Sequence, residues 1–225
     1  MNLFKIEQTV KMSLIDLINK KSILPNKSEA LPGREEEMEV PEEHFVKGTR
    51  LKEPFPNSLE KAIFGMGCFW GVEKKFWELD SVFSTAVGYS GGITPNPTYR
   101  EVCTGFTGHN ETVLVVYHPD KVSYDDLLKI FWEQHDPTQG MRQGNDMGTQ
   151  YRSGIYYMTE SQKKSATKTK STYQNTLSRH GFGSITTEII SARDFYYAEH
   201  NHQQYLAKNP NGYCSLEGTG IKFDL

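Results

Sequence analysis

Residues 61–79 read KAIFGMGCFWGVEKKFWEL, and this stretch decides the predicted fold. Its first part, Ala62–Phe64, is short and apolar, as expected for a buried strand. Two glycines then permit a tight turn, and Cys68 opens a predicted helix that reaches Leu79. The apolar residues that share one face of this helix are Phe69, Val72, Phe76 and Leu79. The stretch therefore predicts a strand–turn–helix unit with a cysteine at the start of the helix.

Strand and helix signals continue toward the C-terminus. Two further helices have N-terminal capping signals, Ser123 with Asp126 and Thr159 with Gln162, and a last helical stretch spans about Ala198–Lys208. The remaining strand candidates are Val82–Gly88, Thr112–Tyr117, Tyr151–Met158 and Ile185–Ile190. Without the flanks, the order is strand, helix, strand, strand, helix, strand. We therefore predict an α+β fold, a ferredoxin-like α/β plait (split βαβ), with a Gly-rich C-terminal tail.

The first 57 residues differ from the rest of the chain. Glu35–Glu37 form an acidic run, and five prolines break up any long element. Only Val10–Leu24 has the pattern of a short amphipathic helix. We predict that residues 1–57 are a partly irregular extension and that residues 58–225 form the main domain together with its tail.

Composition limits the class of protein. The 225 residues are 36% hydrophobic and 24% charged, which is typical of a globular domain rather than of a disordered chain. The net charge of -3 gives no electrostatic reason to expect nucleic acid or an anionic membrane as partner. No apolar run approaches the roughly 20 residues needed to span a bilayer. We therefore expect neither a nucleic-acid nor a membrane partner.

The three cysteines, Cys68, Cys103 and Cys214, are too few and odd in number for a disulfide scaffold. With no secretory signal at the N-terminus, they favour a reducing compartment, where cysteines are catalytic, metal-bound or part of the core. Acidic residues near the N-terminus and the lack of arginine before Arg34 make a weak transit peptide. We predict a cytoplasmic protein, with a mitochondrial form as the alternative.

Cys68 has the setting of a reactive thiol. Unpaired N–H groups and the positive end of the helix dipole lower the pKa of a cysteine at a helix start, which favours the thiolate. Phe69 and Trp70 supply apolar surface beside the sulfur. The alternative is an inert buried thiol at a strand–helix junction.

Two polar segments offer partners for this thiol. Glu111 heads an apolar strand, where burial would raise its pKa and make it a proton donor near neutral pH. The alternative is a solvated strand end. Residues His135–Asp146 form a long polar loop, which is either functional or a solvated connector.

Several motifs together resemble the peptide methionine sulfoxide reductase A family. These motifs are Gly67–Gly71, Asn96–Cys103, Gly108–His109, His135–Pro137, Gly140–Asp146, Tyr196–Glu199 and His202–Leu206. They keep the order and spacing of the family, and the match covers about Leu59–Gly220. Leu31–Glu35 resembles animal members more weakly. The resemblance implies that residues 58–225 are the catalytic domain.

The resemblance also implies a role for each matched residue. Cys68 would be the nucleophile and Cys214 the resolving cysteine, while Cys103 stays a core residue. Phe69 and Trp70 would form the pocket for the substrate methyl group. The residues that hold the sulfoxide oxygen or organise the site would be Tyr99, Glu111, Tyr151 and Asp146.

The implied reaction is the reduction of methionine S-sulfoxide, free or in proteins, and thus the repair of oxidised proteins. A sulfoxide sulfur becomes electrophilic when its oxygen is protonated, and Glu111 could supply that proton. Cys68 would become a sulfenic acid, and Cys214 would condense with it to a disulfide. No cofactor or metal is expected, but thioredoxin is expected as the external dithiol reductant. We also expect a monomer.

The sequence departs from the family pattern at three places. No third cysteine follows Gly218–Gly220. Met147 stands where a histidine is usual, and Asn110 where alanine is common. The absent cysteine is one that shuttles in many relatives, whereas neither Met147 nor Asn110 replaces a residue with an implied catalytic role.

Three other functions compete with the reductase. A papain-like hydrolase would need a histidine hydrogen-bonded to Cys68. A zinc site could use Cys103, His109, His200 and His202, although CxxC spacing is lacking. A methionine-binding module without activity would leave the cysteine–aromatic motif and the second thiol unexplained.

Overall fold

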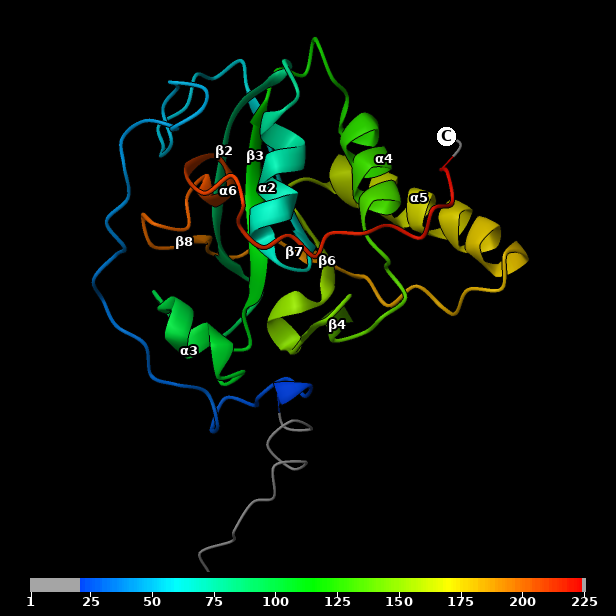
Figure 1. Cartoon of the computed structure of the whole chain (residues 1–225), viewed down its shortest axis with the longest axis horizontal. Coiled ribbons are helices and arrows are strands. Elements are labelled where there is room, and N and C mark those ends of the chain that lie inside the picture. The colour runs from blue at the N-terminus through cyan, green and yellow to red at the C-terminus, as the bar shows by residue number, and fades with distance from the viewer. Residues whose placement is uncertain (1–20, 224–225) are drawn as a thin grey trace, which may run out of the picture.

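A six-stranded sheet forms the centre of the computed structural model, which describes residues 21–223 (Figure 1). The strand order is β7-β6-β1-β3-β2-β8. The strands are β1 (Glu60–Met66), β2 (Val82–Ser90), β3 (Asn110–Tyr117), β6 (Ser153–Tyr157), β7 (Glu188–Ser191) and β8 (Tyr196–Tyr197). β1 pairs antiparallel with β3 and β6, and β2 pairs antiparallel with β3. The inner order β6-β1-β3-β2 is that of the predicted plait, so the α+β fold is confirmed.

Helices and one small hairpin complete the described part of the chain. They are α2 (Phe69–Trp77), α3 (Tyr99–Cys103), α4 (Tyr124–Gln134), α5 (Glu160–Arg179), α6 (Tyr205–Lys208), the 3-10 helix η1 (Thr149–Tyr151) and the hairpin of β4 (Arg142–Gln143) with β5 (Asp146–Met147). The predicted capping box of α4 is present, because Ser123 and Asp126 bond each other's backbone N–H. The side chain of Thr159 likewise accepts from the N–H of Gln162 at the start of α5.

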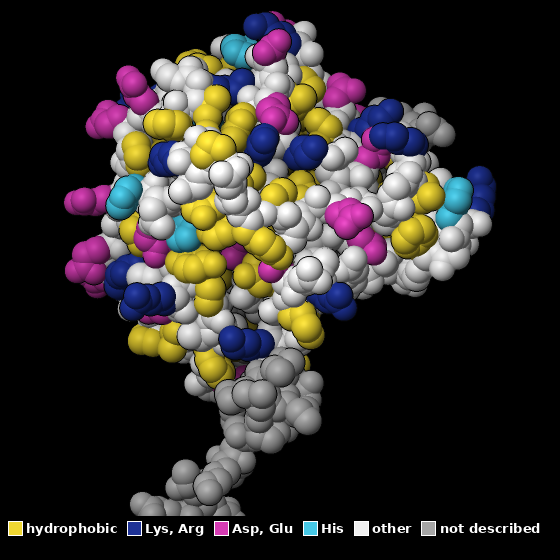
Figure 2. Space-filling model, viewed as in Figure 1, with side chains coloured by type: hydrophobic (Ala, Val, Ile, Leu, Met, Phe, Trp, Pro, Cys, Tyr) yellow, Lys and Arg dark blue, Asp and Glu magenta, His cyan; other side chains and the backbone are white. Residues whose placement is uncertain are grey.

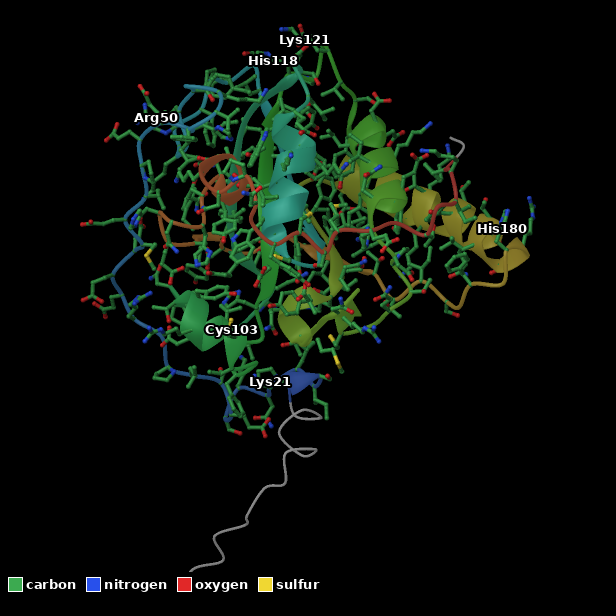
Figure 3. All side chains as sticks on the ribbon, in the orientation of Figure 1. Lys21, Arg50, Cys103, His118, Lys121 and His180 are labelled. Carbon is green, nitrogen blue, oxygen red and sulfur yellow. The ribbon has the colours of Figure 1, made fainter. Side chains whose placement is uncertain are left out.

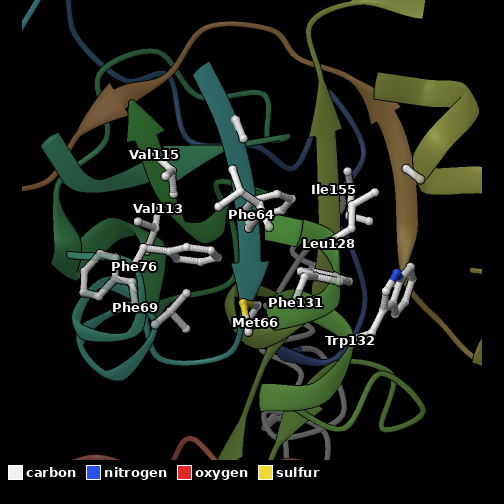
Figure 4. Packing of buried hydrophobic residues seen from close by; sticks show 14 of the residues in the cluster. Phe64, Met66, Phe69, Phe76, Val113, Val115, Leu128, Phe131, Trp132 and Ile155 are labelled. Atoms are coloured by element: carbon white, nitrogen blue, oxygen red, sulfur yellow. The ribbon is translucent and has the colours of Figure 1, made fainter. Parts of the chain in front are cut away.

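Alternation along the strands divides the apolar residues between the two faces of the sheet. Phe64 lies on the helix-covered face, where its ring stacks on Phe76 of α2 and packs at a tilt against Phe131 of α4, with ring centroids 5.4 and 5.5 Å apart (Figure 4). Ile63 lies on the opposite face with Leu114. That second face is covered by residues of the N-terminal extension, including Leu51, and by Phe195 and Tyr197.

The extension is irregular from residue 22 to β1, and we call residues 38–59 the strap. Its pairing is limited, within the described residues, to one bridge between Glu43 and Arg50. The helix predicted for Val10–Leu24 lies, up to residue 20, outside the described residues. The predicted division at residue 57 stays a prediction. Within residues 21–223, no helix is both long and apolar enough to cross a membrane.

Among the elements that differ from the sequence prediction are the last helix and the strand predicted to begin at Tyr151. The last helix is only Tyr205–Lys208, not Ala198–Lys208, because Gln204 adopts a left-handed conformation with φ of 50° that interrupts any longer helix. Tyr151 belongs to η1 rather than to a strand, and β6 begins only at Ser153. Both differences lie beside the predicted site.

Candidate active site

Cys68 lies at the turn between β1 and α2, as the residue that immediately precedes the helix. Its preceding residue, Gly67, has φ of 92°, and a Cβ there would lie 2.5 Å from Cβ of Gln143. Only glycine fits both the backbone conformation and the space. The turn therefore places the thiol at the helix start, with 9% of the Cys68 surface exposed.

The prediction of a lowered Cys68 pKa is wrong for the free protein. Burial raises the pKa of this thiol well above its usual range, and the Glu111 carboxyl raises it further. The backbone N–H of Trp70 lowers the pKa, but this helix-end contribution is the smaller one. Cys68 is therefore a protonated thiol at neutral pH in the free protein.

Glu111 is a buried acid rather than a solvated strand end. It lies in β3 with 1% of its surface exposed, and its Oε2 accepts the N–H of Phe69 at 3.1 Å. Burial raises the pKa of Glu111 to about 8, and Asp146 contributes in the same direction. Its Oε1 has no hydrogen-bond partner among the described residues. Glu111 can thus donate a proton at neutral pH from an oxygen that no protein group occupies.

Two phenols accompany this acid. Tyr99 begins α3, where its backbone N–H donates to Glu199 at 2.8 Å, and Tyr151 ends η1. Burial raises the pKa of both phenols, and the nearby Glu111 carboxyl is the second cause for each. Both phenols therefore remain neutral donors close to Glu111, in the part of the site predicted to hold an oxygen.

An aromatic group borders the thiol. The ring of Trp70 stacks on Tyr205 with centroids 4.0 Å apart, and its indole N–H donates to Nδ1 of His202 at 3.1 Å. The His202 ring also packs on Tyr99 at 4.4 Å and on Phe69 at 5.6 Å. The resemblance gave the residues of the His202–Leu206 motif no role, and His202 was named from the sequence only as a ligand of the alternative zinc site.

The C-terminal tail passes in front of α2 (Figure 1). The tail residue Cys214 lies beside this helix, because its Sγ would be only 2.7 Å from a Cβ at Gly71. Tyr213 and Ser215 both donate to the carboxylate of Asp146, at 3.2 and 2.5 Å. Beyond them, the buried Phe223 packs edge-on against Tyr173 of α5 at 5.6 Å. Asp146 therefore fixes the two neighbours of Cys214, and Phe223 holds the end of the tail in the core.

The six residues predicted to be catalytic come together. Glu111, Asp146 and Cys214 are all close enough to raise the pKa of the Cys68 thiol after burial, its main cause. Cys68 and Tyr99 likewise contribute to the raised pKa of Tyr151, after burial and Glu111. Apolar side chains gather on the face where the tail crosses α2 (Figure 2). The site thus joins two thiols, one buried acid and neutral phenols beside an apolar surface.

Cys103 and the two substituted family positions, Asn110 and Met147, lie around the candidate active site. Cys103 is the last residue of α3 and is partly exposed (Figure 3). Asn110 is buried and donates to the backbone of Arg152 and to the hydroxyl of Tyr156, at 2.9 and 3.0 Å. Met147 is 54% exposed on the hairpin. Among residues 21–223, no group of three or more His, Cys, Asp or Glu side chains could hold a metal ion.

Gly71 leaves room for the second thiol. A Cβ at this position would lie only 2.7 Å from Sγ of Cys214 and 3.1 Å from Cβ of Leu216. We expect Gly71→Ala to push the tail away from α2, since atoms at that distance overlap. The disulfide between Cys68 and Cys214 should then form at least about tenfold more slowly, because reacting atoms must approach closely.

Quenched-flow alkylation of free thiols after one turnover measures that rate. Gly183→Ala is the matched control, because nothing lies within 4 Å of its added Cβ. An unchanged disulfide rate in Gly71→Ala would mean that the second thiol approaches Cys68 by another route.

The plait and this arrangement of thiols define the class as a thiol-dependent oxidoreductase. A family model described as "Peptide methionine sulfoxide reductase" matches residues 60–222, close to the span predicted from the motifs. The chain belongs to this family and is an oxidoreductase that reduces methionine sulfoxide.

Known relatives are similar in sequence to this chain over nearly its whole length. Peptide methionine sulfoxide reductase MsrA 1 of Synechocystis sp. is 62% identical over 210 residues, which cover 93% of this chain and 95% of the relative. MsrA of Pseudomonas aeruginosa is 59% identical over 206 residues, covering 92% of this chain and 96% of the relative.

Solved structures share the fold. Methionine sulfoxide reductase A of Corynebacterium diphtheriae has a TM-score of 0.81 and 47% identity, and the match covers 88% of this chain and 97% of that one. Reduced Mxr1 of Saccharomyces cerevisiae has a TM-score of 0.67 and 34% identity, with coverage of 72% and 92%. Mxr1 has also been solved in complex with Trx2.

Proposed function

We propose that the protein reduces the S epimer of methionine sulfoxide, with Cys68 as nucleophile and Glu111 as proton donor. The observation that carries this assignment is the buried Glu111, which bonds the first residue of the helix that Cys68 opens. Its raised pKa, about 8 because of burial, keeps it protonated at neutral pH. A carboxylic acid in this position suits a substrate that must gain a proton on oxygen.

The first step transfers oxygen from the substrate to Cys68. The substrate methyl group packs against Phe69 and Trp70, while Tyr99 and Tyr151 donate hydrogen bonds to the sulfoxide oxygen. Glu111 protonates that oxygen, which makes the sulfur electrophilic, and Sγ of Cys68 attacks it. The proton of the thiol replaces the one that Glu111 gave away. The hydroxyl group then passes to Sγ of Cys68: its bond to the substrate sulfur and the new S–S bond both break, and methionine leaves with the electron pair. A Cys68 sulfenic acid remains.

The second step removes the oxygen from the protein. The thiol of Cys214 attacks the sulfenic sulfur of Cys68, the S–O bond breaks, and water leaves as the disulfide forms. Two electrons from an external dithiol then restore both thiols. The complex of Mxr1 with Trx2 supports thioredoxin as that dithiol here. We propose the same cycle for free and protein-bound sulfoxide, in a monomeric cytoplasmic enzyme without a bound cofactor.

Cys214→Ser should separate the two steps. Methionine release in the first turnover should persist at the wild-type rate, because Cys68 alone carries out the chemistry at sulfur. Turnover with thioredoxin should fall by at least about tenfold, since the sulfenic acid lacks an intramolecular thiol partner. Cys103→Ser is the control and should keep full turnover. Thioredoxin-dependent turnover that is lost in Cys103→Ser and kept in Cys214→Ser would exchange the roles of these cysteines.

Turnover of the two separated epimers of a methionine sulfoxide peptide, with dithiothreitol as reductant, tests the proposed function. We expect the S epimer to be consumed completely and the R epimer to remain. Consumption of the R epimer at a comparable rate would overturn the assignment of substrate.

A further inference from the structure

A second buried carboxyl lies in α2, outside the group of residues that carries the proposed chemistry. Glu73 is fully buried one helical turn after Trp70. It accepts three hydrogen bonds: from the hydroxyl of Thr85 at 3.0 Å, from the side-chain amide of Gln204 at 2.7 Å and from the backbone N–H of Gln204 at 2.8 Å. A buried carboxylate that accepts three hydrogen bonds has a structural or functional role.

The strap supplies the outer end of the same network. Nδ1 of His44 accepts the backbone N–H groups of Val46 and Lys47, both at 3.1 Å. The proton of this neutral ring is therefore on Nε2, which donates to Oγ1 of Thr85 at 2.8 Å. The Thr85 hydroxyl must then donate to Glu73. His44 thus donates to Thr85 and Thr85 donates to Glu73, which is the final acceptor of this hydrogen-bonded series.

Gln204 is the residue that this acceptor fixes. Its φ of 50° is unusual for a residue other than glycine and costs conformational energy. Both of its bonds to Glu73 compensate for that cost, and its Oε1 accepts the N–H of Phe45 in the strap at 3.1 Å. Glu73 of α2 and Phe45 of the strap therefore both stabilise the left-handed turn at Gln204.

The left-handed turn carries part of the aromatic group. The next residue, Tyr205, stacks on Trp70 at 4.0 Å, and His202, two residues earlier, accepts the Trp70 indole N–H at 3.1 Å. Glu73 and Trp70 lie on the same helix, so the carboxylate ties these two side chains to the helix that presents Trp70. A shift of Gln204 would move both neighbours of the Trp70 ring.

We infer that Glu73 is a positioning residue for the pocket that receives the substrate methyl group, and that His44 and Phe45 of the strap complete its hold on Gln204. The role rests on the proposed function, since it concerns the pocket of that reaction. Glu73 acts through Gln204 and contacts no reacting atom. This assignment also gives part of the N-terminal extension a function in substrate binding.

Glu73→Gln is the informative variant. Glutamine keeps the size, but its NH2 group must meet at least one of the three donors that now point at the carboxylate. We expect the sulfoxide concentration that gives half the maximal single-turnover rate to rise about tenfold, while the rate at saturation stays within about threefold. Tryptophan emission of the free protein should change as well, because Trp70 loses its fixed contact with Tyr205.

Glu78→Gln serves as the control, because Glu78 is an exposed residue after the same helix and pairs only weakly with Lys74, at 3.9 Å. It should match the wild type in both readouts. Gln204→Ala provides a second test, should Glu73→Gln not fold. It removes the side-chain bonds to Glu73 and Phe45 and should raise the same half-saturating concentration.

A wild-type half-saturating concentration and emission spectrum in folded Glu73→Gln or Gln204→Ala would overturn the positioning role. So would a loss confined to the saturating rate. An inactive wild type would refute the proposed function instead, so the two failures are distinguishable.

Discussion

Cys68→Ser should abolish sulfoxide reduction with thioredoxin and with dithiothreitol alike. Serine keeps the size and the helix start, but its hydroxyl is a far weaker nucleophile toward sulfur than a thiol. We expect less than about 1% of the wild-type rate, because in the proposed reaction Cys68 is the group that attacks the sulfoxide. The rate of methionine release from a sulfoxide peptide, followed by chromatography, measures the loss.

Cys103→Ser is the matched control for this prediction, since Cys103 ends α3 and is assigned no part in the reaction. It should release methionine at the wild-type rate. Release above a few per cent of wild type in Cys68→Ser would place the nucleophile elsewhere.

Glu111→Gln should slow the chemical step by about 10²–10⁴-fold, the usual contribution of a positioned general acid. Glutamine can still bond the N–H of Phe69 and donate a hydrogen bond, but it cannot transfer a proton. Substrate binding should therefore change little. Single-turnover rates at several sulfoxide concentrations separate the two effects.

The pH dependence of the single-turnover rate should also follow from Glu111. Burial raises the pKa of Glu111 to about 8, so the protonated, donating form predominates below pH 8 and is lost as the pH rises through that value. The wild-type single-turnover rate should fall across this range, and Glu111→Gln should lack that fall. An identical fall in both proteins would assign the proton to Tyr99, Tyr151 or water instead.

The strand–turn–helix unit around Cys68 was predictable from the sequence because its signals are local. Two glycines, an apolar strand and a helical face all lie within residues 61–79. The capping box of α4 and the apolar run of β3 are local for the same reason. These signals were sufficient to predict the order of elements and therefore the plait.

Properties that depend on distant contacts were not predictable in this way. The pKa of Cys68 is raised rather than lowered, because burial of the thiol outweighs the effect of the helix start. The contact of Trp70 with Tyr205 depends on a left-handed residue, Gln204, whose conformation is stabilised by a carboxylate more than a hundred residues earlier in the chain. No periodic pattern in the sequence reports such a contact.

A single turnover without reductant, followed by disulfide mapping, is the most direct test of Cys68 as the nucleophile and Cys214 as its resolving partner. The fully reduced wild type is mixed with excess S-sulfoxide peptide, and methionine and the linked cysteines are quantified by mass spectrometry. We expect about one methionine released per protein molecule and a link between Cys68 and Cys214, with Cys103 still a free thiol. A link that excludes Cys68, or methionine release with Cys68 still reduced, would contradict this assignment.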